Sequence, residues 1–464
     1  MTLKSLIFLV ILVISANLQA TIHPVPGSYP TIQSAINASA NGDTIAVSPG
    51  TYFENINFKG KKVILTSLFY ITRDTTYIST TIINGSTPIN PDTASCVLFH
   101  SGEDSTAVLQ GFTITGGKGT KWTDIHGAGI YREGGGILMD LSSPTIVHNK
   151  IINNTATNTL GVVSAGGGGI RIGDGNPIIR NNVISLNQGR YGAGIVLNYT
   201  GCRIQNNVIS GNSGGQDYFG GSGIWITHDL LSIPKIIENN TILNNYAAVS
   251  NGTGGLLNWN AANVYLINNI LWANIPANQI KDLSSGLFVV SYNDIEGGLT
   301  NSGNINQEPL LTSGYYYLNS GSPCIDRGDS ATVYNDIEDP GNPGHALGPS
   351  QGLLRNDMGA YGGPYMSLLP SSETLTVIPE IVNENQISIV PNPFSSETTI
   401  SMNQILTNGT LIMYNESGQM VKQYLKVKGH EIKIQRDNLP AGSYHFSIIL
   451  KDSTIATGVV LIKD

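Results

Sequence analysis

The sequence predicts an all-β protein, a parallel β-helix (a solenoid) followed by a small C-terminal β-sandwich. Two observations predict the solenoid. A short motif of two asparagines around an aliphatic pair recurs at intervals of 24 to 33 residues. A glycine-led run of alternating apolar residues precedes most copies of it. The composition agrees, because only 12% of the residues are charged while glycine occurs 54 times in 464 residues, as expected for tightly turned β-structure.

The N-terminal residues 1–20 have the pattern of a secretory signal peptide. Lys4 supplies positive charge, an apolar run extends from Ser5 to Ser15, and Ala20 offers a small residue for cleavage before Thr21. The alternative is a membrane anchor, but this run is much shorter than the ~20 residues that span a bilayer. The sequence therefore predicts an exported protein with no transmembrane segment.

The net charge of −8 argues against nucleic acid as a partner. Nothing in the sequence pattern indicates self-association, so we expect a monomer.

The three cysteines are far apart and in no metal-binding spacing, which leaves either one disulfide with a free thiol or three buried thiols. We favour buried thiols, because cysteine packs as a small apolar residue; the three are Cys96, Cys202 and Cys324.

The solenoid is predicted to start with a capping segment. Thr31–Ile36 reads as a short helix, followed by G-D-T-I-A-V from Gly42 and P-G-T-Y from Pro49. This run resembles the capped start of secreted right-handed β-helix proteins of the pectin-lyase-like superfamily, and the right-handed coil is what that resemblance implies. S-P-C-I-D-R-G from Ser322 and N-D-M-G-A-Y-G-G from Asn356 resemble the closing segments of the same family. A cap keeps the first open coil from pairing with another chain.

Each coil is predicted to contain three short strands. The first follows paired glycines, which permit a corner with positive φ, and alternates apolar with variable residues. A second lies before the first asparagine of the motif, and a third follows it. The first strands read G-G-G-I-L-M from Gly134, G-G-G-I-R-I from Gly167, G-A-G-I-V-L from Gly192, G-S-G-I-W-I from Gly221 and G-G-L-L from Gly254.

The recurring asparagines predict a structural ladder. Stacked coils place equivalent residues about 4.8 Å apart, so one side-chain amide can hydrogen bond to the next and satisfy a buried polar corner. The alternative, that they are glycosylation sites or ligands, is weak because most lack the following Ser or Thr. The first column is Asn149, Asn182, Asn207, Asn240 and Asn269, with a weaker sixth copy at Asn293; the second is Asn154, Asn187, Asn212, Asn245 and Asn274; a third is His148, Asn181, Asn206, Asn239 and Asn268.

The C-terminal part of the chain forms a different module. We expect the β-helix domain to span 21–368, a polar linker 369–386 and the module 387–464. P-N-P-F from Pro391, the strand pattern from Leu411 to Val421, N-L-P-A-G-S-Y from Asn438 and the final V-V-L-I-K alternate strands with turns. This set resembles the type A C-terminal sorting domain of the type IX secretion system, although the chain ends on Asp464. The resemblance implies the type IX machinery as a partner and a location at the cell surface or outside the cell; the alternative is a carbohydrate-binding sandwich.

The side chains expected to face solvent offer a candidate binding surface. On the strands after the glycines these positions include Arg171 and Trp225, with Trp259 one step on. On the strands before the asparagines they include Arg180 and Arg203, on neighbouring coils. Arginine forks suit carboxylate or sulfate groups and exposed tryptophan suits sugar rings. The alternative is structural, with arginine paired to Glu238 and tryptophan packed under a loop.

Further polar residues lie in predicted loops, but they form no recognised catalytic set. G-D-G-N at 173–176 is turn-like, and Asp174 there is a candidate Ca²⁺ ligand, although no second carboxylate accompanies it. Asp336 to Asp339 is acidic and is expected to cap or link. The other loop candidates are Asp124, His126, Arg132, Glu133, Arg190, Asp217, His228 and Asp229.

Two functions remain open on the sequence. The first is a cell-surface or extracellular β-helix that binds polysaccharide or serves as an adhesive or structural protein. The second is a lyase or glycoside hydrolase acting on an acidic polysaccharide, with a groove built from the three arginines and two tryptophans named above. An enzyme of the lyase kind would use Ca²⁺, as the resemblance implies, and a hydrolase would use paired carboxylates. The β-helix fold hosts both classes of protein, so fold alone does not decide between them.

Overall fold

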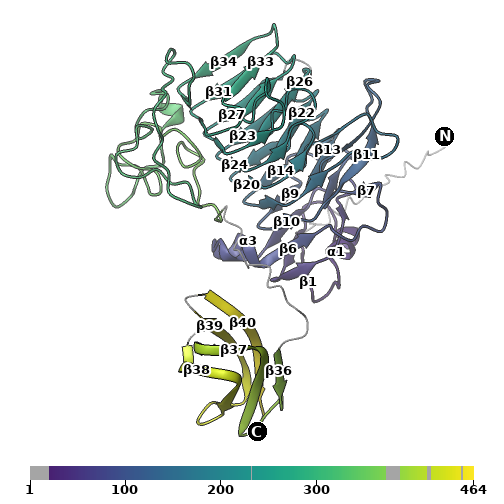
Figure 1. Ribbon diagram of the computed structural model, residues 1–464. Helices are drawn as coiled ribbons and strands as arrows, with labels where there is room; N and C mark the ends of the chain where they lie inside the picture. Colours follow the sequence, from purple (N-terminus) through teal and green to yellow (C-terminus); the bar gives the residue numbers. More distant parts are fainter. Residues whose placement is uncertain (1–19, 231–232, 372–386, 415–419, 451–452, 464) are drawn as a thin grey trace, which may run out of the picture. The chain divides into compact units, whose positions relative to one another are not determined.

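The computed structural model describes residues 20–230, 233–371, 387–414, 420–450 and 453–463 (Figure 1). The signal peptide predicted for residues 1–20 lies almost wholly outside the described residues, as does most of the linker predicted for 369–386. The chain divides into two compact units, residues 1–372 and residues 373–464. The first unit is a parallel β-helix and the second is a small antiparallel β-unit.

Three long parallel sheets form the walls of the solenoid. The ten-stranded sheet contains β1 (Ile22–Val25), β2 (Thr44–Val47), β5 (Ile64–Ser67), β9 (Val108–Gln110), β14 (Thr145–Val147), β19 (Ile178–Arg180), β23 (Cys202–Gln205), β27 (Lys235–Glu238), β31 (Val264–Ile267) and β34 (Phe288–Ser291). The nine-stranded sheet contains β3 (Gly50–Tyr52), β6 (Thr81–Asn84), β10 (Thr113–Thr115), β15 (Lys150–Ile152), β20 (Val183–Ser185), β24 (Val208–Ser210), β28 (Thr241–Leu243), β32 (Ile270–Trp272) and β35 (Asp294–Ile295). The eight-stranded sheet contains β4 (Ile56–Asn57), β8 (Val97–Phe99), β13 (Ile137–Asp140), β18 (Ile170–Gly173), β22 (Ile195–Asn198), β26 (Ile224–Thr227), β30 (Leu256–Asn258) and β33 (Ile280–Asp282).

The interior of the solenoid is a set of stacked aliphatic columns. In the eight-stranded sheet Ile137, Ile170, Ile195 and Ile224 are paired in register on successive coils and are fully buried. Equivalent columns line the other two sheets. Because alternate residues of each strand point into the interior, the period-2 pattern in the sequence maps directly onto this core.

The chain turns the corner before each strand of the eight-stranded sheet at a glycine with a positive φ angle on several coils. Gly167 has φ +59°, and a Cβ there would lie 2.6 Å from the carbonyl oxygen of Ile170. Gly134, Gly192 and Gly221 occupy the same corner on neighbouring coils, also with positive φ. A side chain at these positions would therefore be both strained and crowded.

Helix α1 (Ile32–Ala38) covers the first coil. Thr31 caps it by accepting a hydrogen bond from the Ser34 backbone, and Ser34 accepts one from the Thr31 backbone, which satisfies free donors at the helix start. Ile32, Ala35 and Ile36 are buried against the first core layer. Two short helices that the sequence pattern did not predict, α2 (Phe69–Thr72) and α3 (Thr76–Thr80), lie between β5 and β6.

The two main asparagine columns form continuous ladders at the corners of the coil. Asn207, for example, donates from both its backbone and its side-chain nitrogen to Oδ1 of Asn240, at 3.0 Å each. Its side-chain nitrogen also reaches the carbonyl oxygens of Ile179 and Gln205. The same pattern runs from Asn149 through Asn293 to Asn304, and from Asn154 to Asn274, where Gln279 accepts the last bonds.

The third column has a different role, because it holds the closing segment (residues 304–371) against the side of the solenoid. Its residues have φ between 52° and 60°, which turns their side chains out of the ladder. Figure 1 shows this segment as green loops beside the solenoid; it contains one short 3-10 helix, η1 (Thr332–Tyr334). The contacts join His148 to Ser367, Asn181 to Tyr365, Asn206 to Ala360 and Gly362, Asn239 to Asn356 and Asp357, and Asn268 to Asp329.

Two small sheets lie outside the three walls. One contains β16 (Thr155–Ala156), β21 (Gln188–Gly189), β25 (Ser213–Gly214) and β29 (Tyr246–Ala247). The other contains β7 (Thr93–Ala94), β11 (Gly119–Thr123), β12 (Ile130–Glu133) and β17 (Ala165–Gly166). Within the second, β11 and β12 form an antiparallel hairpin that pairs Trp122 with Tyr131. Figure 1 shows β11 beside β13 of the eight-stranded sheet.

The C-terminal unit is one antiparallel sheet of five strands. Its central strand pairs at its start with the first strand and at its end with the fourth. Its pairing with the third strand contains several register shifts. This pairing curves the sheet around a core that includes Ile400, Leu411 and Phe446. The strands are β36 (Ile387–Val390), β37 (Glu397–Tyr414), β38 (Met420–Gln435), β39 (Gly442–Leu450) and β40 (Ser453–Ile462).

The three cysteines are buried and unpaired. Burial raises the pKa of both Cys96 and Cys202 to about 12.

Among the described residues, no helix combines the length and apolar character needed to cross a bilayer.

Candidate functional site

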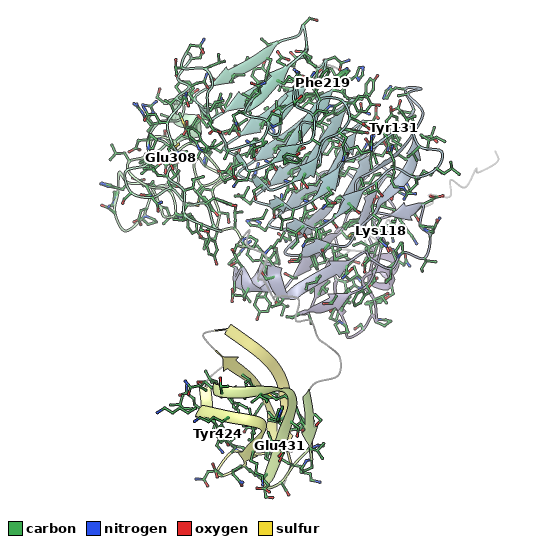
Figure 2. All side chains as sticks on the ribbon, in the orientation of Figure 1. Lys118, Tyr131, Phe219, Glu308, Tyr424 and Glu431 are labelled. Carbon is green, nitrogen blue, oxygen red and sulfur yellow. The ribbon has the colours of Figure 1, made fainter. Side chains whose placement is uncertain are left out.

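The outer face of the eight-stranded sheet carries a small cavity beneath the β11–β12 hairpin. We call it the hairpin pocket; its volume is about 210 Å³. Figure 2 labels Tyr131, a hairpin residue in its wall. The pocket is lined by Trp122, Asp124, Ala128, Tyr131, Glu133, Tyr191, Asn198, Tyr199, Tyr218, Trp225, Thr227, His228 and Trp259.

The hairpin corrects one expectation from the sequence. The row predicted to face solvent on this sheet is paired in register as expected, but it is buried. Arg171 is 0% exposed and Trp225 is 8% exposed. The physical reason is that the hairpin and the turns around Tyr191 and Tyr218 cover this face of the sheet. A side chain that points away from the interior of the coil is therefore not necessarily exposed to solvent.

Arg171 and Glu133 form a buried ion pair beside the pocket. Their Nε and Oε2 atoms are 3.3 Å apart, and Arg171 Nη1 also donates to Asp140 at 2.7 Å. Its guanidinium lies 3.8 Å from the centre of the Trp122 ring. A Cβ at Gly173 would collide with the guanidinium, so this glycine provides the space for it.

Both carboxylate oxygens of Glu133 are engaged within the protein. Oε2 accepts from Trp122 Nε1 at 2.8 Å, and Oε1 accepts a short hydrogen bond from the Tyr191 hydroxyl. Burial raises the pKa of Glu133, although Arg171 acts in the opposite direction. With these partners Glu133 holds the hairpin on the sheet, and neither of its oxygens lacks a donor.

Asp124 differs from Glu133 because one of its oxygens has no partner. Its Oδ2 accepts from the Ala128 backbone at 2.8 Å, whereas the buried Oδ1 makes no hydrogen bond within the protein. The residue is only 4% exposed and lines the pocket. A buried carboxylate oxygen without a donor is costly, which makes Asp124 the chief candidate for contact with a ligand.

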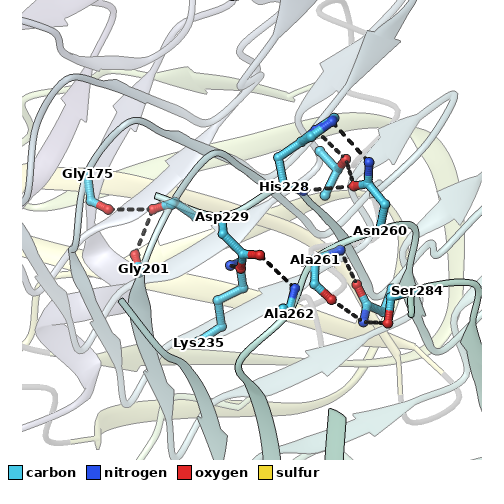
Figure 3. Close-up of polar contacts among 12 residues, drawn as sticks. Gly175, Gly201, His228, Asp229, Lys235, Asn260, Ala261, Ala262 and Ser284 are labelled. Atoms are coloured by element: carbon cyan, nitrogen blue, oxygen red, sulfur yellow. Dashed lines mark hydrogen bonds and ion pairs between the residues drawn. The ribbon is translucent and has the colours of Figure 1, made fainter. Parts of the chain in front are cut away.

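A polar turn fixes His228 at the edge of the pocket (Figure 3). Asn260 Oδ1 accepts from the Thr227 hydroxyl at 2.7 Å and from the His228 backbone at 2.9 Å. That orients the Asn260 amide so that its nitrogen donates to His228 Nε2 at 3.0 Å. His228 Nδ1 then carries the proton, bonded to the Thr227 hydroxyl. Burial lowers the pKa of His228, which agrees with a neutral ring.

The strand that follows this turn, β27, begins with a buried lysine that was not among the candidate residues of the sequence. Lys235 occupies an inward position, in register with Cys202 and Val264. It is fully buried, and its Nζ lies 2.6 Å from Asp229 Oδ1. Asp229 also accepts from the Ala262 backbone (Figure 3). This pair anchors the turn that carries His228.

Aromatic rings make up most of the remaining wall. Tyr191 meets Trp225 edge-on with ring centres 5.0 Å apart, and Tyr218 meets Trp259 in the same way at 5.7 Å. Trp225 Nε1 donates to the Tyr218 carbonyl at 3.3 Å. Trp259 is half-buried. Aromatic rings and a carboxylate thus line the same small cavity.

Asp174 lies outside the pocket wall. Its Oδ1 is 2.8 Å from His126 Nε2, and the His126 ring stacks on Tyr199 with centres 3.5 Å apart. Tyr199 stacks in turn on His228. No group of three or more His, Cys, Asp or Glu side chains is placed to hold a metal ion in the part of the chain that the structure describes. Ca²⁺ at Asp174 therefore stays a prediction.

Arg180 and Arg203 lie on a different wall, the ten-stranded sheet. Arg180 aligns with Gln205 and donates to it at 2.7 Å, while its guanidinium lies 3.7 Å from the centre of the Tyr365 ring in the closing segment. Arg203 is exposed beside a cavity of about 340 Å³ that Glu238 and Tyr365 also line. The structure therefore does not bring the three predicted arginines and two tryptophans into one groove. Only Trp225 and Trp259 line the hairpin pocket, with Arg171 next to it.

The other loop candidates hold loops together. Arg132 is buried and binds the Pro91 and Gly119 carbonyls and Asp92. Arg190 pairs with Asp217 at 2.7 Å.

Sequence reasoning missed five aromatic residues of the pocket, namely Trp122, Tyr131, Tyr191, Tyr199 and Tyr218. The signal that could have found the hairpin is the pair of short segments T-K-W-T at 120–123 and I-Y-R-E at 130–133. Both are rich in aromatic and β-branched residues and are separated by a glycine-containing turn, a pattern typical of paired strands.

Comparison with known families identifies the C-terminal unit. Residues 388–463 match the family model of the secretion system C-terminal sorting domain. This unit is a sorting domain. It marks the protein for export through the type IX system to the cell surface or the extracellular space, as the motifs around Pro391 and Asn438 indicated. A comparison with curated proteins found no match for the chain.

Proposed function

We propose that this exported protein binds carbohydrate, with one sugar ring seated in the hairpin pocket. The observation that carries the proposal is a cavity whose wall combines aromatic rings with Asp124, a buried carboxylate that has one unpartnered oxygen. Sugars present apolar faces that pack on aromatic rings and hydroxyl groups that donate to carboxylates. The volume of about 210 Å³ suits a single ring rather than a long buried chain.

The charges of the pocket favour a ligand other than an acidic polysaccharide. Its wall contains the carboxylates of Asp124 and Glu133 and no lysine or arginine among the described residues. A uronate would bring its own negative charge toward Asp124. The arginines that were expected to bind such a ligand are either paired, as Arg171 is, or on the other wall, as Arg180 and Arg203 are.

Binding is better supported than hydrolysis by paired carboxylates. Such a mechanism needs one carboxyl group as acid and a second as base or nucleophile. Glu133 has both oxygens bound to protein groups, so Asp124 is the only carboxylate among the described residues of the pocket with a free oxygen. A surface binding or adhesive role therefore fits the geometry better than the hydrolase alternative.

The test is calorimetric titration of the purified full chain with neutral, acidic and amino-containing oligosaccharides. Trp259→Ala should weaken binding at least tenfold, whereas Tyr246→Ala, an exposed aromatic outside the pocket, should leave it unchanged. Equal affinity of both variants and the native chain for every sugar would refute the assignment. Release of new reducing ends in the same samples would favour the enzyme alternative.

A further inference from the structure

We infer that the hairpin pocket selects a sugar that carries a protonated amino group, such as a glucosamine residue with a free amine. This inference rests on the proposed carbohydrate-binding function and narrows its ligand class. It follows from the formal charge of each group facing the cavity.

The acidic groups leave one uncompensated negative charge. Glu133 is paired with Arg171 at 3.3 Å and receives two further hydrogen bonds. Asp124 has no cationic partner among the described residues, and its Oδ1 has no donor there. A buried charge without a counter-charge is stabilised strongly by a cation that enters the same cavity. A ligand ammonium in the cavity would supply this missing counter-charge.

No basic group of the protein fills this role among the described residues. His228 lines the pocket, but its Nε2 accepts from Asn260, so the ring is neutral. His126 is outside the wall and bonded to Asp174. Lys281 is also outside it, binds the Asn251 carbonyl and lies 4.5 Å from the Phe219 ring centre.

The aromatic walls favour the same ligand. The faces of tryptophan and tyrosine attract cations, by about 0.5–2 kcal/mol per contact, depending on exposure. The pocket offers Trp122, Tyr131, Tyr218, Trp225 and Trp259. A neutral sugar packs on the aromatic rings but gains no electrostatic attraction to Asp124 or to the ring faces. N-acetylation of the amine removes its charge and therefore the same attraction. A free amine is therefore the group that uses all features of the cavity.

The test is titration of the purified full chain with matched oligomers of glucosamine, N-acetylglucosamine and glucose at pH 6. We expect the glucosamine oligomer to bind at least tenfold more tightly than the other two. Asp124→Asn should remove this preference, so that the glucosamine and glucose oligomers bind with affinities equal within about twofold. Asp282→Asn, an exposed carboxylate outside the pocket, is the control and should keep the preference.

A second measurement uses the native chain and does not depend on the folding of a variant. An amine beside electron-withdrawing groups titrates near pH 8, as an α-amino group does. Raising the pH from 6 to 9 should therefore weaken binding of the glucosamine oligomer severalfold relative to the glucose oligomer at each pH. Equal binding of all three oligomers, or an unchanged ratio at pH 9, would overturn the amine inference and leave carbohydrate binding standing. Binding of none of them would overturn the amine inference, and the wider titration with neutral and acidic oligosaccharides then decides whether the pocket binds carbohydrate.

Discussion

Asn206 donates its side-chain amide to the carbonyl oxygen of Gly362 at 2.7 Å, across 156 residues of sequence. Its neighbour Asn207 donates into the ladder inside the solenoid. Asn206 has a positive φ of 55°, and its side chain therefore points toward the closing segment while that of Asn207 points into the solenoid. One dipeptide thus stabilises the coil and attaches the closing segment to it.

We expect Asn206→Ala to loosen the closing segment without unfolding the solenoid. The substitution removes the hydrogen bonds to Ala360 and Gly362 and leaves two buried acceptors unsatisfied, at about 1–3 kcal/mol each. Hydrogen exchange of residues 355–368 should become faster while the strands of the walls keep their protection. Loss of protection in β20 and β24 to the same extent would contradict separate roles for Asn206 and Asn207.

Asn207→Ala should instead destabilise the solenoid itself. The side chain makes three donor contacts and accepts two bonds from Asn182, so its loss leaves several buried polar groups unpaired. We expect a decrease of roughly 2–5 kcal/mol in the free energy of unfolding, from about 1–3 kcal/mol for each such group. Urea denaturation measures it. Asn158→Ala, at an exposed position, should change stability by less than about 0.5 kcal/mol.

The buried carboxyls of Asp336 and Asp357 predict a loss of stability toward alkaline pH. Burial raises the pKa of both above the ordinary aspartate value. A raised folded-state pKa gives stability that is complete below the unfolded pKa and is lost as pH rises through the folded one. The dependence is about 1.4 kcal/mol per pH unit where the folded carboxyl alone keeps its proton.

Thermal unfolding between pH 5 and pH 9 tests this directly. Asp336→Asn cannot ionise and should flatten the profile. Glu308→Gln, an exposed carboxylate of the closing segment labelled in Figure 2, should leave it unchanged. A native protein whose stability does not fall between pH 5 and pH 9 would show that the two aspartates ionise freely in the folded state.

The three thiols should be inert in the folded protein. All are buried, and burial raises the pKa of Cys96 and Cys202 to about 12, which leaves almost no reactive thiolate near pH 8. A thiol reagent added at that pH should label none of them until denaturant is present, and then all three. Rapid labelling of the native chain would mean that at least one cysteine is accessible.

The Lys235–Asp229 pair predicts unequal effects of two substitutions. Asp229→Ala leaves a fully buried ammonium without its partner and should destabilise by about 3–5 kcal/mol. Lys235→Met leaves Asp229, which is partly exposed and still bonded to Ala262, and should cost less. Denaturant unfolding of both variants, beside Asp282→Ala as an exposed control, measures the difference. Equal losses of stability in the two variants would show that the burial of Lys235 does not determine the cost of breaking this pair.

The coils could be predicted because their signals are local. Alternation of apolar residues specifies which side of each strand faces the core, and the position of Asn207 or Asn240 one coil apart specifies the ladder. The motifs around Pro391 and Asn438 likewise indicated the sorting domain, which the family comparison confirmed.

The candidate site could not be predicted in the same way. Arg171 and Trp225 stand at outward positions of their strands, and nothing within the coil shows that a hairpin far upstream, at Tyr131, covers them. Arg180 and Arg203 were expected together on the strands before the asparagines, and those strands are neighbours in the ten-stranded sheet. The groove of the enzyme alternative also needed Arg171, which belongs to another wall of the solenoid.

The sequence by itself determined the repeating coil, its aliphatic core, its asparagine ladders and the export domain, because each depends on residue type at a fixed spacing. Only the tertiary structure decided where the pocket lies, that Glu133 is fully bonded while Asp124 keeps a free oxygen, and that the third column holds the closing segment. These features depend on contacts between segments far apart in the chain, whose packing is set by shape and by the pairing of buried charges rather than by any local period.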